Sequence, residues 1–175
     1  AVDAAFQAAA TAAQAIEVRD WGSWRAAITD KKPSLLLLLA HTDSQDDLST
    51  LVIGQDDAAL LTDLDQRFVG GADGAGPLVV LLGCSTAVEK PRFESFITEF
   101  RRSGAAIVSG TLCKILGRHA GPIAKALVDQ LALAAQDSDG VPLGEYMTRL
   151  RRRMLADGIP IVLTVIAFGD ADWII

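Results

Sequence analysis

The chain has 175 residues, and its formal net charge at pH 7 is −6, because 16 Lys and Arg residues stand against 22 Asp and Glu residues. That length predicts one domain with its own hydrophobic core, and the acidic balance argues against nucleic acid as a direct partner. Two cysteines are too few for a disulfide framework or a four-ligand zinc site, and no apolar run reaches the roughly 18 residues of a membrane helix. We therefore expect a single cytoplasmic domain over residues 1–175 that makes no membrane contact.

The first predicted elements are two helices and a buried strand. Alanine-rich residues 1–18 favour a helix, which we expect to link this domain to the rest of a longer protein. Asp20 can cap a second helix that has two tryptophans and Ile28 on one face. Residues 34–40 form an apolar run without alternation, which is typical of a strand covered on both faces of a parallel sheet. The polar residues 41–44 that follow are expected to form a loop.

The rest of the chain alternates between strand patterns and helix patterns. A short strand is expected at residues 48–53, and residues 58–68 slightly favour a helix. Further apolar runs predict strands at residues 78–82, 105–108 and 161–168. Apolar residues at helical spacing predict amphipathic helices at residues 93–100, 123–133 and 143–155. This alternation predicts an α/β layer sandwich around a mostly parallel central sheet.

Two reactive side chains follow buried strands of this expected sheet. His41 comes directly after the first apolar run, and Cys84 after the second. Ligands of open parallel sheets bind at the carboxyl ends of the strands, and neighbouring strands are only about 4.8 Å apart. A thiol needs a base to become a nucleophile at neutral pH, and histidine is the usual base. The residues alone leave a second interpretation open, in which Cys84 is a small core residue and His41 a structural hydrogen-bonding group.

The two strand ends resemble a known family. The segments LLLLLAH at residues 35–41 and LVVLLGCST at 78–86 are similar to the strand ends of CHAT domains, which belong to the caspase-like cysteine peptidases together with separase and the gingipains. Residues 96–111, 144–153 and 167–170 resemble the helices and strands that follow the nucleophile in that family. The similarity extends over nearly the whole chain.

The resemblance implies both a fold and a chemistry. The fold would be a caspase-like three-layer α/β/α sandwich, and the activity would be that of a cysteine endopeptidase. Cys84 would be the nucleophile and His41 the proton-transfer residue, while the backbone N–H groups of Thr42 and Cys84 would hold the oxyanion. No metal or cofactor is implied. The implied partners are a protein or peptide substrate and a fused or separate regulatory or sensor domain, as in an effector module of bacterial defence or signalling.

Two positions depart from the family pattern. The family usually has Gly directly after the His, whereas this chain has Thr42, a β-branched residue that tolerates fewer backbone conformations. Where the family often has Trp followed by an acidic residue, this chain has Cys113 and Lys114. Together with Asp43, these two residues are candidate substrate-binding residues, and Lys114 would then disfavour a basic P1 side chain. A solvated position at the sheet rim is the alternative for Lys114, and a solvated loop is the alternative for Asp43.

Two other functions remain open. A catalytically inactive CHAT-like module that acts in protein–protein interaction would account for Thr42 and for the altered pocket. A generic α/β hydrolase or binding domain would make His41 and Cys84 incidental. The distance between these two side chains separates that last interpretation from the other two.

Overall fold

The computed structural model describes residues 15–39, 41–45, 48–54, 57–70, 76–83, 96–113, 115 and 117–175. For residues 41–45, 48, 49, 117 and 118 we describe the backbone alone. The N-terminal helix expected at residues 1–18 lies outside the described residues except for residues 15–18, and these four form no regular element.

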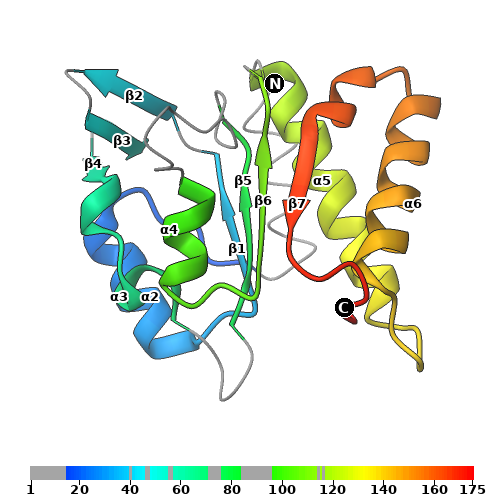
Figure 1. Ribbon diagram of the computed structural model, residues 1–175, viewed down its shortest axis with the longest axis horizontal. Helices are drawn as coiled ribbons and strands as arrows, with labels where there is room; N and C mark the ends of the chain where they lie inside the picture. Colours follow the sequence, from blue (N-terminus) through cyan, green and yellow to red (C-terminus); the bar gives the residue numbers. More distant parts are fainter. Residues whose placement is uncertain are drawn as a thin grey trace.

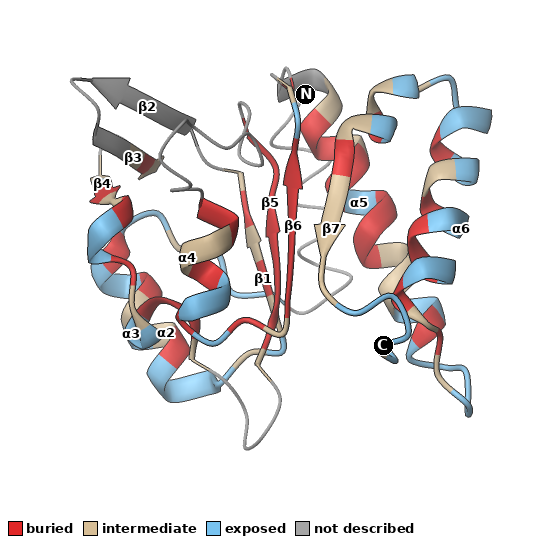
Figure 2. Cartoon of the chain, viewed as in Figure 1, coloured by how far each residue is buried: buried red, intermediate tan, exposed pale blue. Residues whose placement is uncertain are grey.

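The centre of the molecule is a four-stranded sheet with the strand order β1-β5-β6-β7 (Figure 1). The first three strands are parallel, and the edge strand β7 runs antiparallel to β6. Every residue of β5 and β6 is buried, which explains why their sequences do not alternate (Figure 2). The prediction of a mostly parallel central sheet is therefore confirmed, and its strands are β1 (Leu35–Leu38), β5 (Leu78–Leu81), β6 (Ile107–Thr111) and β7 (Val165–Phe168).

Helices cover both faces of this sheet (Figure 1). One face is covered by α2 (Trp21–Lys31), α3 (Gln66–Val69) and α4 (Phe96–Arg102), and the other by α5 (Gly117–Ala134) and α6 (Leu143–Ala156). Alternate residues of β5 divide between two hydrophobic cores, since Val79 packs with the first group of helices and Val80 with the second. The chain thus forms an α/β structure of three layers.

A second, smaller sheet follows β1. It contains three antiparallel strands in the order β2-β3-β4, with His41 opposite Val52 at one end of the first pair. The strands are β2 (His41–Gln45), β3 (Leu48–Ile53) and β4 (Asp57–Leu60). The strand expected at 48–53 is confirmed, but the loop expected at 41–44 is wrong, because these polar residues pair along an edge of the small sheet. A polar edge strand has no periodic pattern of apolar residues, so the sequence gives no signal for it.

The expectation of a helix at residues 58–68 is also wrong. That segment forms β4, then the 3₁₀ turn η1 (Leu61–Asp63), and then the single turn α3. Pairing with β3 overrides the slight local preference for helix, because it buries Ala59 and places Leu51 at 0 % exposure.

The remaining helix predictions hold, with shifted ends. The Asp20 side chain accepts the Ser23 backbone N–H at 2.7 Å and caps α2 as expected. Gly104 follows α4 with φ +111°, while residues 93–95 of the expected helix lie outside the described part of the chain. Helices α5 and α6 pack apolar residues into the same core, although α5 begins six residues earlier than expected, at Gly117.

The last predicted strand is shorter than expected. Residues 161–168 divide between the 3₁₀ helix η2 (Pro160–Thr164) and β7. Pro160 opens η2, and the Thr164 hydroxyl donates to the Ile161 carbonyl at 2.7 Å, which stabilises a turn that an apolar run does not reveal. Across the described helices, none is long and apolar enough to cross a membrane.

Candidate functional site

The carboxyl ends of β1 and β5 lie side by side. The two strands are direct neighbours with Leu38 opposite Leu81, and the Leu82 N–H donates to the Leu38 carbonyl at 2.9 Å. In the sequence, His41 lies three positions after Leu38, and Cys84 three positions after Leu81. The two strands that precede the candidate residues therefore end together at one edge of the sheet.

The candidate residues themselves are described to different extents. The backbones of His41, Thr42 and Asp43 lie in β2, opposite Val52, Leu51 and Thr50 of β3. Cys84 and Lys114 lie outside the described residues. Cys113 is a half-buried free cysteine that comes two positions after the end of β6.

Two further contacts hold the end of β6 and the segment that precedes Cys84 in the chain. The Thr111 hydroxyl, at the end of β6, donates to the Gly83 carbonyl at 2.6 Å, and both residues are buried. The next residue, Leu112, donates its N–H to the Thr164 carbonyl at 2.9 Å, although its side chain is 47 % exposed. The segment that precedes Cys84 is therefore attached to β6, and the end of β6 is attached to the segment before β7.

Thr111 is a residue of this edge that the sequence interpretation missed. In the sequence, position 111 is only the last residue of the segment 96–111, and no role was expected for it. A hydroxyl in a buried strand is itself a signal, because buried polar groups are almost always hydrogen-bonded. The signal predicts that Thr111 has a partner, but it does not say which one, since Gly83 is 28 residues away in the chain.

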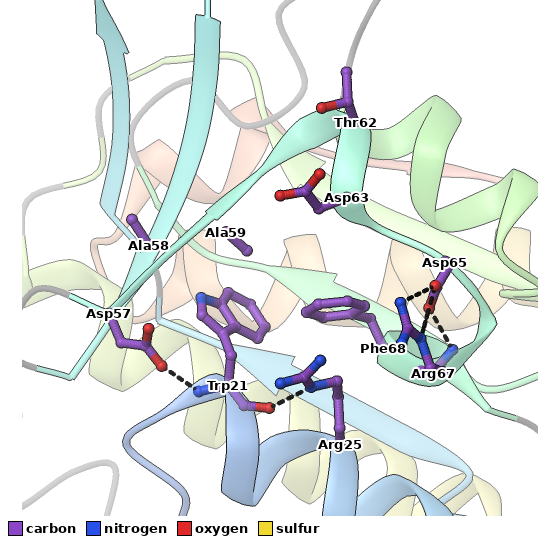
Figure 3. Close-up of a pocket in the computed structure, with 10 residues that line it drawn as sticks. All are labelled: Trp21, Arg25, Asp57, Ala58, Ala59, Thr62, Asp63, Asp65, Arg67 and Phe68. Atoms are coloured by element: carbon purple, nitrogen blue, oxygen red, sulfur yellow. Dashed lines mark hydrogen bonds and ion pairs between the residues drawn. The ribbon is translucent and has the colours of Figure 1, made fainter.

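A pocket of about 540 Å³ lies elsewhere, between the start of α2 and the segment from β4 to α3 (Figure 3). None of the site residues predicted from the sequence lines it; the lining residues are Trp21, Arg25, Asp57, Ala58, Ala59, Thr62, Asp63, Asp65, Arg67 and Phe68.

Most charged groups of this pocket contact the protein itself. The Asp57 carboxylate accepts the Trp21 backbone N–H, and the Arg25 guanidinium lies 5.5 Å from the centre of the Phe68 ring. Asp65 and Arg67 form an ion pair at 2.7 Å, in which the hydrogen bond lowers the pKa of Asp65 and raises that of Arg67. The Trp21–Asp57 bond thus links α2 to β4, and the contact of Arg25 with Phe68 links α2 to α3.

The described side chains include no group of three or more His, Cys, Asp or Glu residues that could hold a metal ion. Comparison of the sequence with models of protein families finds no match, and a search of curated proteins finds none either. The resemblance to CHAT domains stays a prediction from the sequence, and it depends on the two strand-end motifs, on their order in the chain, and on the segments that follow them.

Proposed function

We propose that this chain is a cysteine endopeptidase domain of the caspase-like CHAT type. The observation that supports the proposal most directly is the pairing of β1 with β5, because it puts the chain segments that lead to His41 and Cys84 at the same edge of the sheet. A nucleophile and its base must approach within hydrogen-bond reach, and residues that follow neighbouring strand ends of a parallel sheet are close enough for such an approach to form. The three-layer arrangement of helices and sheet is compatible with a caspase-like sandwich.

The proposed reaction has two stages. In the first, the Cys84 thiolate attacks the carbonyl carbon of the scissile peptide bond, and the carbonyl oxygen becomes an oxyanion held by the N–H groups of Cys84 and Thr42. The C–N bond then breaks, His41 gives its proton to the leaving amine, and a thioester remains on Cys84. In the second stage water attacks the thioester, His41 takes a proton from it, and the C–S bond breaks to release the carboxylate.

The substrate would be a protein or peptide that binds across the carboxyl edge of the sheet. Asp43, Cys113 and Lys114 are the residues proposed to contact it, and Lys114 would favour an acidic or neutral P1 side chain over a basic one. The domain would act in the cytoplasm as a regulated effector within a larger bacterial defence or signalling protein, with a sensor domain or partner that controls it.

One observation favours the alternative of a catalytically inactive interaction module. Thr42 replaces the family's usual Gly, and its backbone lies opposite Leu51 within the antiparallel pair β2–β3. A β-branched residue in a strand has less freedom to turn its N–H toward an oxyanion than glycine would have. Peptidase function requires the Thr42 N–H to turn toward the oxyanion, whereas an inactive interaction module places no such requirement on this residue.

A peptide-library cleavage assay tests the proposal, with Cys84→Ala as the blank. Peptidase function predicts cleavage by the wild-type chain that is lost in Cys84→Ala, and a P1 profile without preference for Arg or Lys. Equal background cleavage in both proteins would contradict the peptidase and favour the interaction module. Cleavage that depends on Cys84 but prefers basic P1 residues would support the peptidase function and contradict the proposed effect of Lys114 on P1 specificity.

A further inference from the structure

Strand β6 is buried on both faces, yet it carries two hydroxyl side chains, Ser109 and Thr111. Each hydroxyl donates to a carbonyl on a different neighbouring segment. Ser109 donates to Ile166 of β7 at 3.0 Å, and Thr111 donates to Gly83 after β5 at 2.6 Å. The two hydroxyls therefore attach β6 to its neighbours on opposite sides, and only Thr111 contacts the segment that leads to Cys84.

The Thr111 contact acts where the β5–β6 ladder has ended. The last paired residues of that ladder are Val80 and Ser109. Beyond them, Leu82 is held from the β1 side through its N–H bond to Leu38, and Gly83 is held from the β6 side by the Thr111 hydroxyl. The two residues before Cys84 are thus fixed from both neighbouring strands, one by a backbone bond and one by a side chain.

The Gly83 carbonyl belongs to the same peptide unit as the N–H of residue 84. A peptide unit is planar and usually trans, so its carbonyl and its N–H point in opposite directions. We propose that Thr111 is a positioning residue: by holding the Gly83 carbonyl toward β6, it fixes the orientation of the peptide unit that leads to Cys84. This inference depends on the proposed function, in which the Cys84 N–H stabilises the oxyanion.

The expected effect of losing the hydroxyl is on the transition state. Val has nearly the shape of Thr but no donor, so Thr111→Val leaves the buried Gly83 carbonyl without this partner and frees the peptide unit to rotate. Loss of one oxyanion donor costs about 10²–10³ in kcat, and a misplacement of about 1 Å costs about 10². We expect Thr111→Val to lower kcat by roughly 10²-fold and to leave KM nearly unchanged.

The experiment compares three variants on a peptide that the wild-type chain cleaves. Thr111→Ser retains the hydroxyl and should keep a kcat near that of the wild type. Ser109→Ala is the matched control, because it removes a hydroxyl bond from the same strand but on the β7 side. We expect its kcat to stay near that of the wild type even if its melting temperature falls. Thr111→Val alone should show the fall in kcat.

Three results would overturn the inference. A kcat for Thr111→Val equal to that of Ser109→Ala would show that the Gly83 contact has no role in the reaction. If Thr111→Val does not fold, Thr111→Ser decides, since a fall of about 10²-fold there would show that the hydroxyl is not the determinant. A rise in KM at constant kcat would assign Thr111 to substrate binding instead.

The same proteins distinguish failure of the inference from failure of the proposed function. Iodoacetamide alkylation, read by peptide mass spectrometry, compares Cys84 with Cys113 in each variant. The proposed peptidase function and the role of Thr111 would both be overturned if the wild-type chain cleaved no peptide and iodoacetamide reacted no faster with Cys84 than with Cys113. A wild-type chain that cleaves, with a Thr111→Val variant that cleaves equally well, would overturn the role of Thr111 alone.

Discussion

Tyr146 joins the two helices that cover one face of the central sheet. It lies on α6 with only 2 % of its surface exposed, and its hydroxyl donates to the Leu127 carbonyl of α5 at 2.9 Å. Burial raises the pKa of this phenol well above its usual value. The side chain therefore contributes a packed ring and a single hydrogen bond, and two substitutions separate these contributions.

Tyr146→Phe removes the hydroxyl and keeps the ring. A neutral hydrogen bond contributes about 0.5–1.5 kcal/mol net, and Leu127 lies inside a helix where its carbonyl can keep a backbone partner. We expect a loss of about 1 kcal/mol in the free energy of unfolding. Tyr146→Ala removes the ring as well and leaves a cavity between α5 and α6, so its expected loss is about 3–5 kcal/mol.

Urea denaturation followed by circular dichroism measures both losses. The midpoint should fall in the order wild type, Phe variant, Ala variant, at an unchanged m-value. For a chain of this size, 1 kcal/mol corresponds to a fall in Tm of about 2–4 °C. A Phe variant with the wild-type midpoint would refute the contribution of the hydrogen bond. An Ala variant no less stable than the Phe variant would refute the packing between the two helices.

The alkaline pH dependence has a definite sign. The folded-state pKa of Tyr146 lies above the unfolded value of about 10. The resulting stabilisation is fully present below about pH 10 and is lost as the pH rises toward the folded-state pKa. Tyr146 is the single tyrosine of the chain, so tyrosinate absorbance reports on it directly. Tyrosinate should appear together with the loss of helical dichroism, and its appearance in the folded protein would contradict the burial.

Three further substitutions test other parts of the fold. Asp20→Ala should lower Tm at neutral pH, because the Ser23 hydrogen bonds lower the pKa of Asp20 and stabilise the fold above the unfolded pKa of about 4. The difference in Tm from the wild type should shrink as the pH falls below about 4 toward the folded-state pKa, and a difference that does not change with pH would contradict the cap. Gly76→Ala should lower the free energy of unfolding by about 1–3 kcal/mol or more, because the added methyl group would collide with the Gly104 carbonyl. Urea denaturation measures this loss, and a midpoint equal to that of the wild type would contradict the close contact. Leu150→Ala should cost about 2–5 kcal/mol by the same measurement, since Leu150 is 0 % exposed, whereas a loss below 1 kcal/mol would place it outside the core.

The buried strands and the large helices could be predicted from the sequence because each has a distinct pattern. The run that became β5 lacks alternation because both of its faces are buried, whereas in β1, an equally apolar run, half-buried and buried residues alternate. Treating every apolar run as a strand made the last predicted strand too long, because the residues of the 3₁₀ helix η2 and those of β7 form one nearly continuous apolar run. Strand β2 was missed for the opposite reason, because its polar residues at an edge show no apolar pattern.

The candidate site was only partly accessible to sequence reasoning. Position after a buried strand was enough to nominate His41 and Cys84. The direct pairing of β1 with β5 was one of several possible strand orders, and it skips the whole segment that forms the small sheet. The bond from Thr111 to Gly83 depends on that order as well. Long-range pairings of this kind are set by packing of the complete chain, and no local pattern encodes them.

The proposed peptidase requires Cys84 to be a thiolate nucleophile that depends on His41. The most direct measurement is the rate at which an electrophilic peptide probe labels Cys84 in the wild-type chain and in His41→Ala, with Cys113 as the internal reference. We expect selective labelling of Cys84 in the wild type and its loss in His41→Ala, because removal of the base lowers the thiolate fraction. Equal labelling of Cys84 in the two proteins would contradict it.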